Sequence, residues 1–219
     1  MNNLTPNNHR VLAHRGLWNE SRAQNSIDAI SAALDLGFGI EIDVRERSGE
    51  LVLSHDFPND GSAVLEPKHP VWDKLTAQTP VAFNIKTDGL GPELKNCLNE
   101  LPGHNGFTFD MSIPEAVVYI SLNIPFAQRV SEYEPVSVFA ALPQSAGDRV
   151  WLDSFHTDWW LDIKGFSGSL KGNQVFVVSP ELHGRDPQRV WDWCYQEFQQ
   201  DVDIYICTDY PEKVLEQWS

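Results

Sequence analysis

The sequence predicts an α/β fold that closes into a TIM (β/α)8 barrel. Short apolar runs typical of strands alternate about eight times with amphipathic runs typical of helices. No linker or change in composition divides the chain. Eight strand-helix units in one undivided stretch favour a closed parallel barrel, so we expect a single domain over residues 1–219 with a polar tail at 1–10.

The first elements follow from apolar periodicity and capping residues. A strand is predicted at 11–14, after the polar tail. Asn25 or Ser26 can cap the helix that follows, and Gly37 can end it. In the next segment, 39–44, acidic and apolar residues alternate, which is the pattern of a strand with two different faces.

A turn and a long loop come next. Ser48 and Gly49 predict a turn into a second apolar run at 51–55. The stretch 56–79 is rich in proline and polar residues, so we expect irregular structure with one short helix near 72–75.

The second part of the chain repeats the strand-helix alternation. The weakest unit is 153–174, because three glycines there disfavour a full helix. The predicted strands are 80–86, 106–111, 127–130, 150–155, 174–179 and 203–207, and the predicted helices are 92–101, one that begins at 112, 136–142, 186–200 and 211–218.

Composition excludes several classes of function. The formal charge of -15 and the lack of a basic run argue against a nucleic-acid partner, which would need clustered Lys and Arg. Cys97, Cys194 and Cys207 are widely spaced and odd in number, so a disulfide framework or structural zinc site is not expected. No signal-peptide core or membrane-length apolar run occurs, which predicts a cytoplasmic protein without membrane insertion. The oligomeric state does not follow from the sequence.

Two carboxylates and two histidines give the first indication of a site. Glu41 and Asp43 are two residues apart in a strand, so both project from one face and can bind a hard divalent cation. His14 and His55 each end an apolar run beside a turn, as catalytic groups at strand ends would. In a barrel of this kind the chemistry lies at the carboxyl ends of the strands. The candidates at these ends are His14, Glu41, Asp43, Asn84, Lys86, Asp110 and Asp153.

With these residues assembled, the sequence resembles the glycerophosphodiester phosphodiesterases and the related phosphatidylinositol-specific phospholipase C-like enzymes. The middle of the chain, 106–200, matches only in the order of strands and helices. The pieces that carry the resemblance are Ala13-His14-Arg15-Gly16, Gln24-Asn25-Ser26, Glu41-Ile42-Asp43-Val44, His55-Asp56, Asn84-Ile85-Lys86 and Thr208-Asp209-Tyr210-Pro211.

The resemblance implies a TIM barrel that hydrolyses a small-molecule phosphodiester with a divalent cation, Mg2+ or Ca2+. Imidazoles titrate in the range that proton transfer at neutral pH requires, which agrees with this chemistry. Carried over by position, it implies His14 and His55 as acid and base, Glu41 and Asp43 as metal ligands with Asn84 at the third ligand position, and Arg15 and Lys86 as phosphate contacts.

The chain departs from the family pattern in two places. Asn84 replaces an acidic ligand and brings no charge. The affinity for a metal ion should therefore fall, unless a carboxylate such as Asp110, Glu132 or Asp153 serves as the third ligand. The segment after His55 is also shorter than is usual in the family. The sequence therefore does not identify the alcohol groups that the phosphate of the substrate carries.

Two other functions remain as alternatives. The first is a barrel that binds a phosphorylated ligand without turnover, which Asn84 would explain. The second is an unrelated barrel enzyme that transfers protons next to a carbonyl and stabilises a metal-bound enolate.

Several positions have a structural reading beside the functional one. Lys86 can pair with a carboxylate of the 39–44 strand only to stabilise the barrel interior. Arg129 can form a salt bridge with Glu132 or Glu134, and Asp56 can orient a histidine or form a turn. The strand-end residues Asp110 and Asp153 can cap or form turns, and Thr208-Asp209-Tyr210-Pro211 can start a helix.

Overall fold

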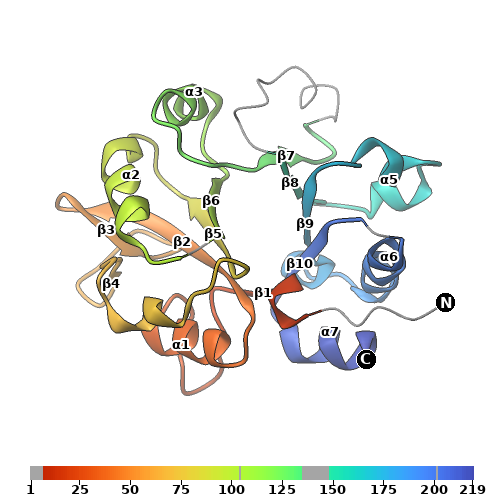
Figure 1. Cartoon of the computed structure of the whole chain (residues 1–219), viewed down its shortest axis with the longest axis horizontal. Coiled ribbons are helices and arrows are strands. Elements are labelled where there is room, and N and C mark those ends of the chain that lie inside the picture. The colour runs from red at the N-terminus through yellow and green to blue at the C-terminus, as the bar shows by residue number, and fades with distance from the viewer. Residues whose placement is uncertain (1–6, 104, 135–147, 201) are drawn as a thin grey trace.

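The computed structural model describes residues 7–103, 105–134, 148–200 and 202–219, and it is a barrel of parallel strands surrounded by helices (Figure 1). The strands of the barrel pair with one another in parallel, as buried strands joined by helical crossovers do. The barrel strands are β1 (Val11–His14), β2 (Gly39–Arg47), β5 (Pro80–Ile85), β6 (Asn105–Phe109), β7 (Gln128–Val130), β8 (Arg149–Leu152), β9 (Gln174–Val178) and β10 (Ile204–Thr208).

Hydrogen bonds connect these strands in the order β6-β5-β2-β1-β10-β9-β8-β7. One parallel bridge, between Thr108 of β6 and Phe126, joins the two ends of this series. There the Thr108 amide donates to Pro125 O at 2.9 Å, and the Ala127 amide donates to Thr108 O at 2.8 Å. The sheet is therefore closed, which confirms the predicted TIM barrel.

A hairpin extends β2 outside the barrel. Strands β3 (Glu50–Leu53) and β4 (Ala63–Val64) pair antiparallel, β3 with the far end of β2. The apolar run at 51–55 is thus a strand only as far as Leu53, and it is not a barrel strand. His55 consequently lies in the loop that follows β3.

The helices cover the outside of the barrel (Figure 1). Ser26 caps the first one by accepting a hydrogen bond from the Ala29 amide, as one of the two predicted caps. The short helix expected near 72–75 is a 3-10 turn, and the glycine-rich unit 153–174 holds only short helices. The α-helices are α1 (Ile27–Asp35), α2 (Gly91–Glu100), α3 (Ile113–Ser121), α5 (Phe166–Ser169), α6 (Gln188–Gln199) and α7 (Pro211–Trp218), and the 3-10 turns are η1 (Asn8–Arg10), η2 (Pro70–Lys74), η4 (Trp159–Asp162) and η5 (Pro180–His183). The predicted helix at 136–142 lies outside the described residues.

Two apolar clusters hold the barrel together. One lies between the strands and the helices, and the other fills the barrel interior. Inside, Trp151 stacks on Phe109 with ring centroids 3.8 Å apart, and Phe176 stacks on Tyr205 at 4.5 Å. This aromatic plug closes the interior, so the polar side chains above it lie at the carboxyl ends of the strands. No helix among the described residues has the length and apolarity needed to cross a membrane.

Candidate active site at the carboxyl ends of the strands

The alternation in β2 directs its two carboxylates into the barrel. Glu41 is 1% exposed and Asp43 is fully buried. The register places His14 beside Glu41 across the β1–β2 pair and Asn84 beside Asp43 across the β2–β5 pair. Four predicted site residues therefore come together at one end of the barrel.

Asp43 is surrounded by cationic and amide donors. Arg15 Nε lies 2.9 Å from Oδ2 and Lys86 Nζ lies 3.2 Å from Oδ1. Asn25 donates its amide group to Oδ2 at 2.8 Å and accepts from the Asp43 amide at 3.0 Å. Burial alone would raise the pKa of Asp43, but the Lys86 charge, the Asn25 hydrogen bond and the Arg15 charge together lower it. Asp43 is therefore an anion that holds the two cations expected to meet phosphate.

Glu41 is less well compensated than its neighbour. Its Oε2 accepts the Arg15 backbone amide at 3.1 Å, while its buried Oε1 has no hydrogen-bond partner in the part of the chain that is described. Burial, together with the Asp43 charge, raises the pKa of Glu41 to about 7, against the opposing effect of His14 and Lys86.

A divalent cation would fit the unpaired oxygens at this point. Asn84 Oδ1 is buried and, like Glu41 Oε1, lacks a hydrogen-bond partner among the described residues. Carboxylate and amide oxygens are the ligands that Mg2+ and Ca2+ prefer. As the side chains stand in the described residues, no group of three or more His, Cys, Asp or Glu is arranged to hold a metal ion. The donors that fit are therefore Glu41 and Asn84, with Asp43 already occupied by Arg15 and Lys86.

The turn after β1 is held in one conformation by close packing. Arg15 and Gly16 have positive φ angles of 58° and 79°. A Cβ on Gly16 would lie 2.7 Å from the backbone carbon of Ala29, so no other residue fits there. The Arg15 carbonyl also accepts the Asn25 amide at 3.0 Å. The start of α1 thus fixes the Arg15 side chain over Asp43.

His14 is paired with a residue from the last strand. Its Nδ1 lies 2.7 Å from Asp209 Oδ1, and its Nε2 lies 3.9 Å from Glu41 Oε2. Trp18 Nε1 also donates to Asp209 Oδ1 at 3.3 Å. Asp209 directly follows β10, and β10 pairs with β1 in the closed barrel. The sequence predicts the motif at 208–211 as part of the family resemblance and as a helix start, but it assigns no role to Asp209, so the pairing with His14 was missed.

His55 does not join this cluster directly. Its side chain is 46% exposed, and its Nδ1 lies 2.9 Å from Oδ1 of Asp56, which is 93% exposed. It lines a cavity of about 370 Å3 together with Gln24 and Asn25, two residues that contact Arg15 and Asp43 respectively. Within the described residues, no contact joins His55 to His14 or to the β2 carboxylates. Asp56 therefore pairs with His55, which is compatible with one of the two roles, orienting a histidine or forming a turn, that the sequence suggested for it.

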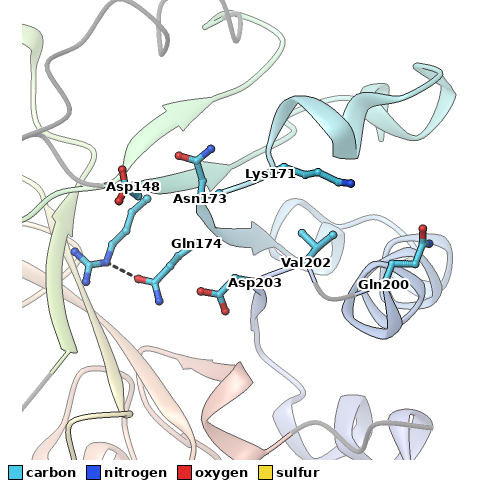
Figure 2. Close-up of a pocket in the computed structure, with 9 residues that line it drawn as sticks. Asp148, Lys171, Asn173, Gln174, Gln200, Val202 and Asp203 are labelled. Carbon is cyan, nitrogen blue, oxygen red and sulfur yellow. Dashed lines mark hydrogen bonds between the residues drawn. The ribbon is translucent and has the colours of Figure 1, made fainter. Parts of the chain in front are cut away.

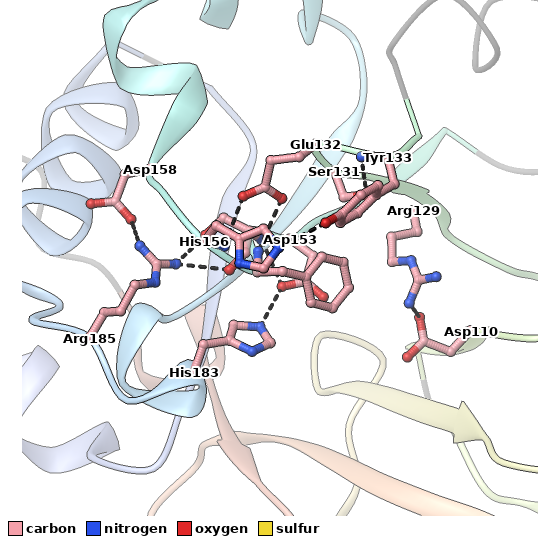
Figure 3. Close-up of polar contacts among 12 residues, drawn as sticks. Asp110, Arg129, Ser131, Glu132, Tyr133, Asp153, His156, Asp158, His183 and Arg185 are labelled. Carbon is pink, nitrogen blue, oxygen red and sulfur yellow. Dashed lines mark hydrogen bonds and ion pairs between the residues drawn. The ribbon is translucent and has the colours of Figure 1, made fainter.

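The other half of the barrel mouth carries polar pairs that are already satisfied (Figure 3). Arg129 Nη1 lies 3.0 Å from Asp110 Oδ1, and its Nε lies 2.7 Å from Glu134 Oε2, so the predicted salt bridge forms with Glu134. His183 Nε2 lies 2.8 Å from Asp153 Oδ1. Burial raises the pKa of Asp110, although the Arg129 charge opposes this.

Glu132 is occupied in a different way. Its carboxylate accepts the backbone amides of Phe155 and His156 at 3.0 Å each and that of Thr157 at 3.2 Å. These hydrogen bonds lower its pKa despite the cost of desolvation. The three carboxylates considered as substitutes for Asn84 therefore have other partners in this structure: Asp110, Glu132 and Asp153.

A further cavity, of about 680 Å3, opens at the opposite end of the barrel (Figure 2). It lies at the amino ends of β8, β9 and β10 and is lined by Asp148, Lys171 and Asp203 among others. Arg149 and Gln174 also line it, and Arg149 Nε donates to Gln174 Oε1 at 3.0 Å. None of the predicted site residues lines it, so the candidate site remains at the carboxyl ends.

Comparison with known proteins supports the fold. No family model and no curated protein sequence matches the chain. The structure is similar to a glycerophosphodiester phosphodiesterase from Agrobacterium tumefaciens, with a TM-score of 0.66 and 18% identity over 94% of this chain and 98% of the other. It is also similar to one from Thermotoga maritima, with a TM-score of 0.64 and 18% identity over 95% and 97%. A glycerophosphoryl diester phosphodiesterase from Parabacteroides distasonis matches with a TM-score of 0.58 and 16% identity over 94% and 84%. The chain therefore has the barrel fold that these three proteins share.

Proposed function

We propose that the chain is a divalent-cation-dependent phosphodiesterase of the glycerophosphodiester phosphodiesterase type, acting on a glycerophosphodiester or a sugar-phosphate diester. The observation that carries this proposal is His14, which pairs with Asp209 and faces Glu41. In the same cluster, one buried oxygen of Glu41 and one of Asn84 lack a hydrogen-bond partner among the described residues. The similarity to solved phosphodiesterases over nearly the whole chain supports it.

The anionic substrate would be attracted by two cations in an otherwise acidic protein. Arg15 and Lys86 are each bound to Asp43 through only part of their donor groups. A guanidinium has five N–H donors and an ammonium has three, so both can still donate to phosphoryl oxygens. Asp43 thus orients the two cations and keeps them from electrostatic repulsion in the free protein.

His14 is suited to accept the proton of the attacking hydroxyl. The Asp209 carboxylate accepts from Nδ1, which leaves Nε2 as the nitrogen directed toward Glu41 and the site. In this proposal Nε2 takes the proton, and His55 is the second imidazole, which protonates the leaving alcohol. Because His55 lies in a loop outside the barrel, we expect it to approach the substrate from the cavity it shares with Gln24.

The residues that would hold the cation are Glu41 and Asn84, with Asp43 on the same face of the barrel. When bound, such a cation neutralises phosphate charge and lowers the pKa of a coordinated hydroxyl. Binding requires the ionised form of Glu41, whose pKa in the cation-free protein is raised to about 7. The identity of the ion, Mg2+ or Ca2+, and the cytoplasmic location stay predictions.

A second candidate function is binding of a phosphorylated ligand without hydrolysis. Two observations favour it. Asn84, which is neutral, stands at a ligand position, and His55 pairs with Asp56 and not with the carboxylate cluster among the described contacts. In that case Arg15 and Lys86 would bind phosphate, and no group would complete the proton transfer.

Hydrolysis assays distinguish the two functions. Purified protein is tested on bis(p-nitrophenyl) phosphate and a panel of glycerophosphodiesters with Mg2+, Ca2+, Mn2+ or EDTA. We expect cation-dependent turnover that is lost in His14→Ala and His55→Ala but kept in His9→Ala, since His9 lies before β1 at the opposite end of the barrel. If no substrate is cleaved but calorimetry detects binding of a phosphorylated ligand, the second function is correct. If neither cleavage nor cation binding is detected, the phosphodiesterase proposal is wrong.

A further inference from the structure

A carboxylate outside the predicted site contacts the residue that orients His14. Glu181 belongs to η5, the turn after β9, and both its carboxylate oxygens are occupied. Oε1 accepts the Asp209 backbone amide at 3.1 Å and the Thr208 hydroxyl. Oε2 accepts the Ser179 hydroxyl. Glu181 therefore links the end of β9 to the end of β10.

The inner part of this link is buried and has further support. Ser179 and Thr208 are both fully buried. Trp191 of α6 donates its indole N–H to the Ser179 hydroxyl at 2.7 Å, and the Ser179 amide donates to Cys207 O at 2.9 Å. A buried network in which each member has its partners is rigid, because any displacement leaves a polar group unpaired.

The turn is also held at its other end. His183, two residues after Glu181, pairs with Asp153 at the end of β8 (Figure 3). Leu182 between them packs on the apolar plug of the barrel. The turn consequently cannot shift without breaking contacts to β8, β10 and the interior together.

We propose that Glu181 is a positioning residue that holds Asp209 against His14. Glu181 accepts a hydrogen bond from the Asp209 backbone amide, so the Asp209 side chain can still accept from His14. When this hydrogen bond is lost, the residues at the end of β10 can shift. The Asp209 carboxylate then no longer fixes the orientation and tautomer of the His14 ring. This inference deepens the proposed function and rests on it only for its effect on turnover.

The decisive measurement is independent of activity. NMR of protein labelled with 15N at histidine reports the Nδ1–H proton of His14 bound to Asp209, assigned by its absence in His14→Gln. We expect this signal to be lost or broadened in Glu181→Ala, as in Asp209→Asn. It should stay unchanged in Glu212→Ala, which removes the same charge from an exposed position on the first turn of α7.

A conservative variant separates positioning from folding. In Glu181→Gln the amide oxygen can still accept from Asp209 and Thr208, so the His14 signal should return even if the bond from Ser179 is lost. Should Glu181→Ala fail to fold, Ser179→Ala and Thr208→Val, which each remove one donor to Glu181, take its place and should weaken the signal.

Turnover gives the second readout. Removal of an outer partner of a catalytic group typically lowers activity by about 10- to 100-fold, so we expect kcat of Glu181→Ala to fall by this factor with little change in KM. A wild-type His14 signal in Glu181→Ala would overturn the inference, whatever the activity. Absence of turnover in the wild-type protein would instead count against the proposed function, and the NMR comparison would still decide the role of Glu181.

Discussion

Glu41 and Asp43 lie two residues apart on the inner face of β2, yet only Asp43 is neutralised by cations. Arg15 and Lys86 both pair with Asp43, whereas Glu41 accepts one backbone amide and its Oε1 has no hydrogen-bond partner in the part of the chain that the structure describes. The pKa of Asp43 is lowered, and that of Glu41 is raised to about 7. The pair thus provides a fixed anion for orienting cations and a second carboxylate that can respond to pH or to an added ion.

The raised pKa of Glu41 predicts a pH dependence of stability. In the folded, cation-free protein the protonated form of Glu41 is favoured. The contribution of this protonation to the free energy of unfolding is complete below 4.5, the pKa of Glu41 in the unfolded chain, and it is lost as the pH rises through about 7. Glu41→Gln should remove this loss and raise the free energy of unfolding at pH 8 in EDTA, on the order of 3 kcal/mol for a shift of this size. Urea unfolding at pH 4.5, 6 and 8 measures the effect. Since other groups also titrate, the difference between the two proteins is the relevant quantity. A constant difference across pH would contradict the prediction.

Asn84→Asp should strengthen cation binding. The substitution adds a negative charge next to Asp43, with which Asn84 pairs across β2 and β5. The affinity of such sites increases with the number of charged ligands, so we expect a gain of about tenfold or more. Calorimetric titration with Mg2+ and Ca2+ gives the affinity. The same variant should be less stable than wild type in EDTA, because it buries a further carboxylate. Unchanged affinity would place the cation away from Asn84.

Asp209→Asn should impair catalysis far more than Asp56→Asn. Both residues pair with a histidine Nδ1, but Asp209 is largely shielded from solvent and Asp56 is 93% exposed. An amide at position 209 would favour the wrong tautomer of His14, so we expect kcat to fall by about 100-fold or more. The exposed pair is replaceable by water, and Asp56→Asn should stay within about threefold of wild type. Steady-state kinetics of both variants on one substrate provides the test, and equal effects would contradict the unequal roles.

Gly16→Ala should destabilise the protein strongly. Its φ of 79° disfavours any side chain, and the new Cβ would lie 2.7 Å from Ala29 C and 2.8 Å from Ile30 N. We expect a loss of about 3 kcal/mol or more, together with lost activity. Gly49 is a matched control, because its φ is 88° but, its two chain neighbours aside, no atom of the described residues lies within 4 Å of an added Cβ. Gly49→Ala should cost only about 1 kcal/mol. Thermal and urea unfolding measure both, and similar losses would show that backbone strain alone determines the effect.

Much of the barrel follows from local patterns. Alternation at 39–44 placed Glu41 and Asp43 on one face, and strand pairing then brought Asn84 and His14 beside them. Such periodicity is a property of each strand by itself, so it can be read without knowing the neighbours. The same reasoning gave most helix starts, because capping residues act within one turn.

What escaped prediction depends on contacts between distant segments. The role of Asp209 requires that the last strand lies beside the first, and that of Glu181 requires the turn after β9 to reach β10. The position of β3 outside the barrel also depends on which edge of β2 it meets, since a short apolar run looks alike in a parallel or an antiparallel pair. The exposed position of His55 follows from this.

The pairing of His14 with Asp209 spans 195 positions of the chain. During synthesis, His14 leaves the ribosome long before its partner exists, and an imidazole without its carboxylate is only one half of the proposed catalytic unit. Contacts of such high sequence separation form late, after the cost of closing a long loop has been met. Enzymatic activity would therefore require that β10 has paired with β1 and the barrel is closed. A nascent chain that still lacks β10 would be inactive, although its first three barrel strands are already synthesised.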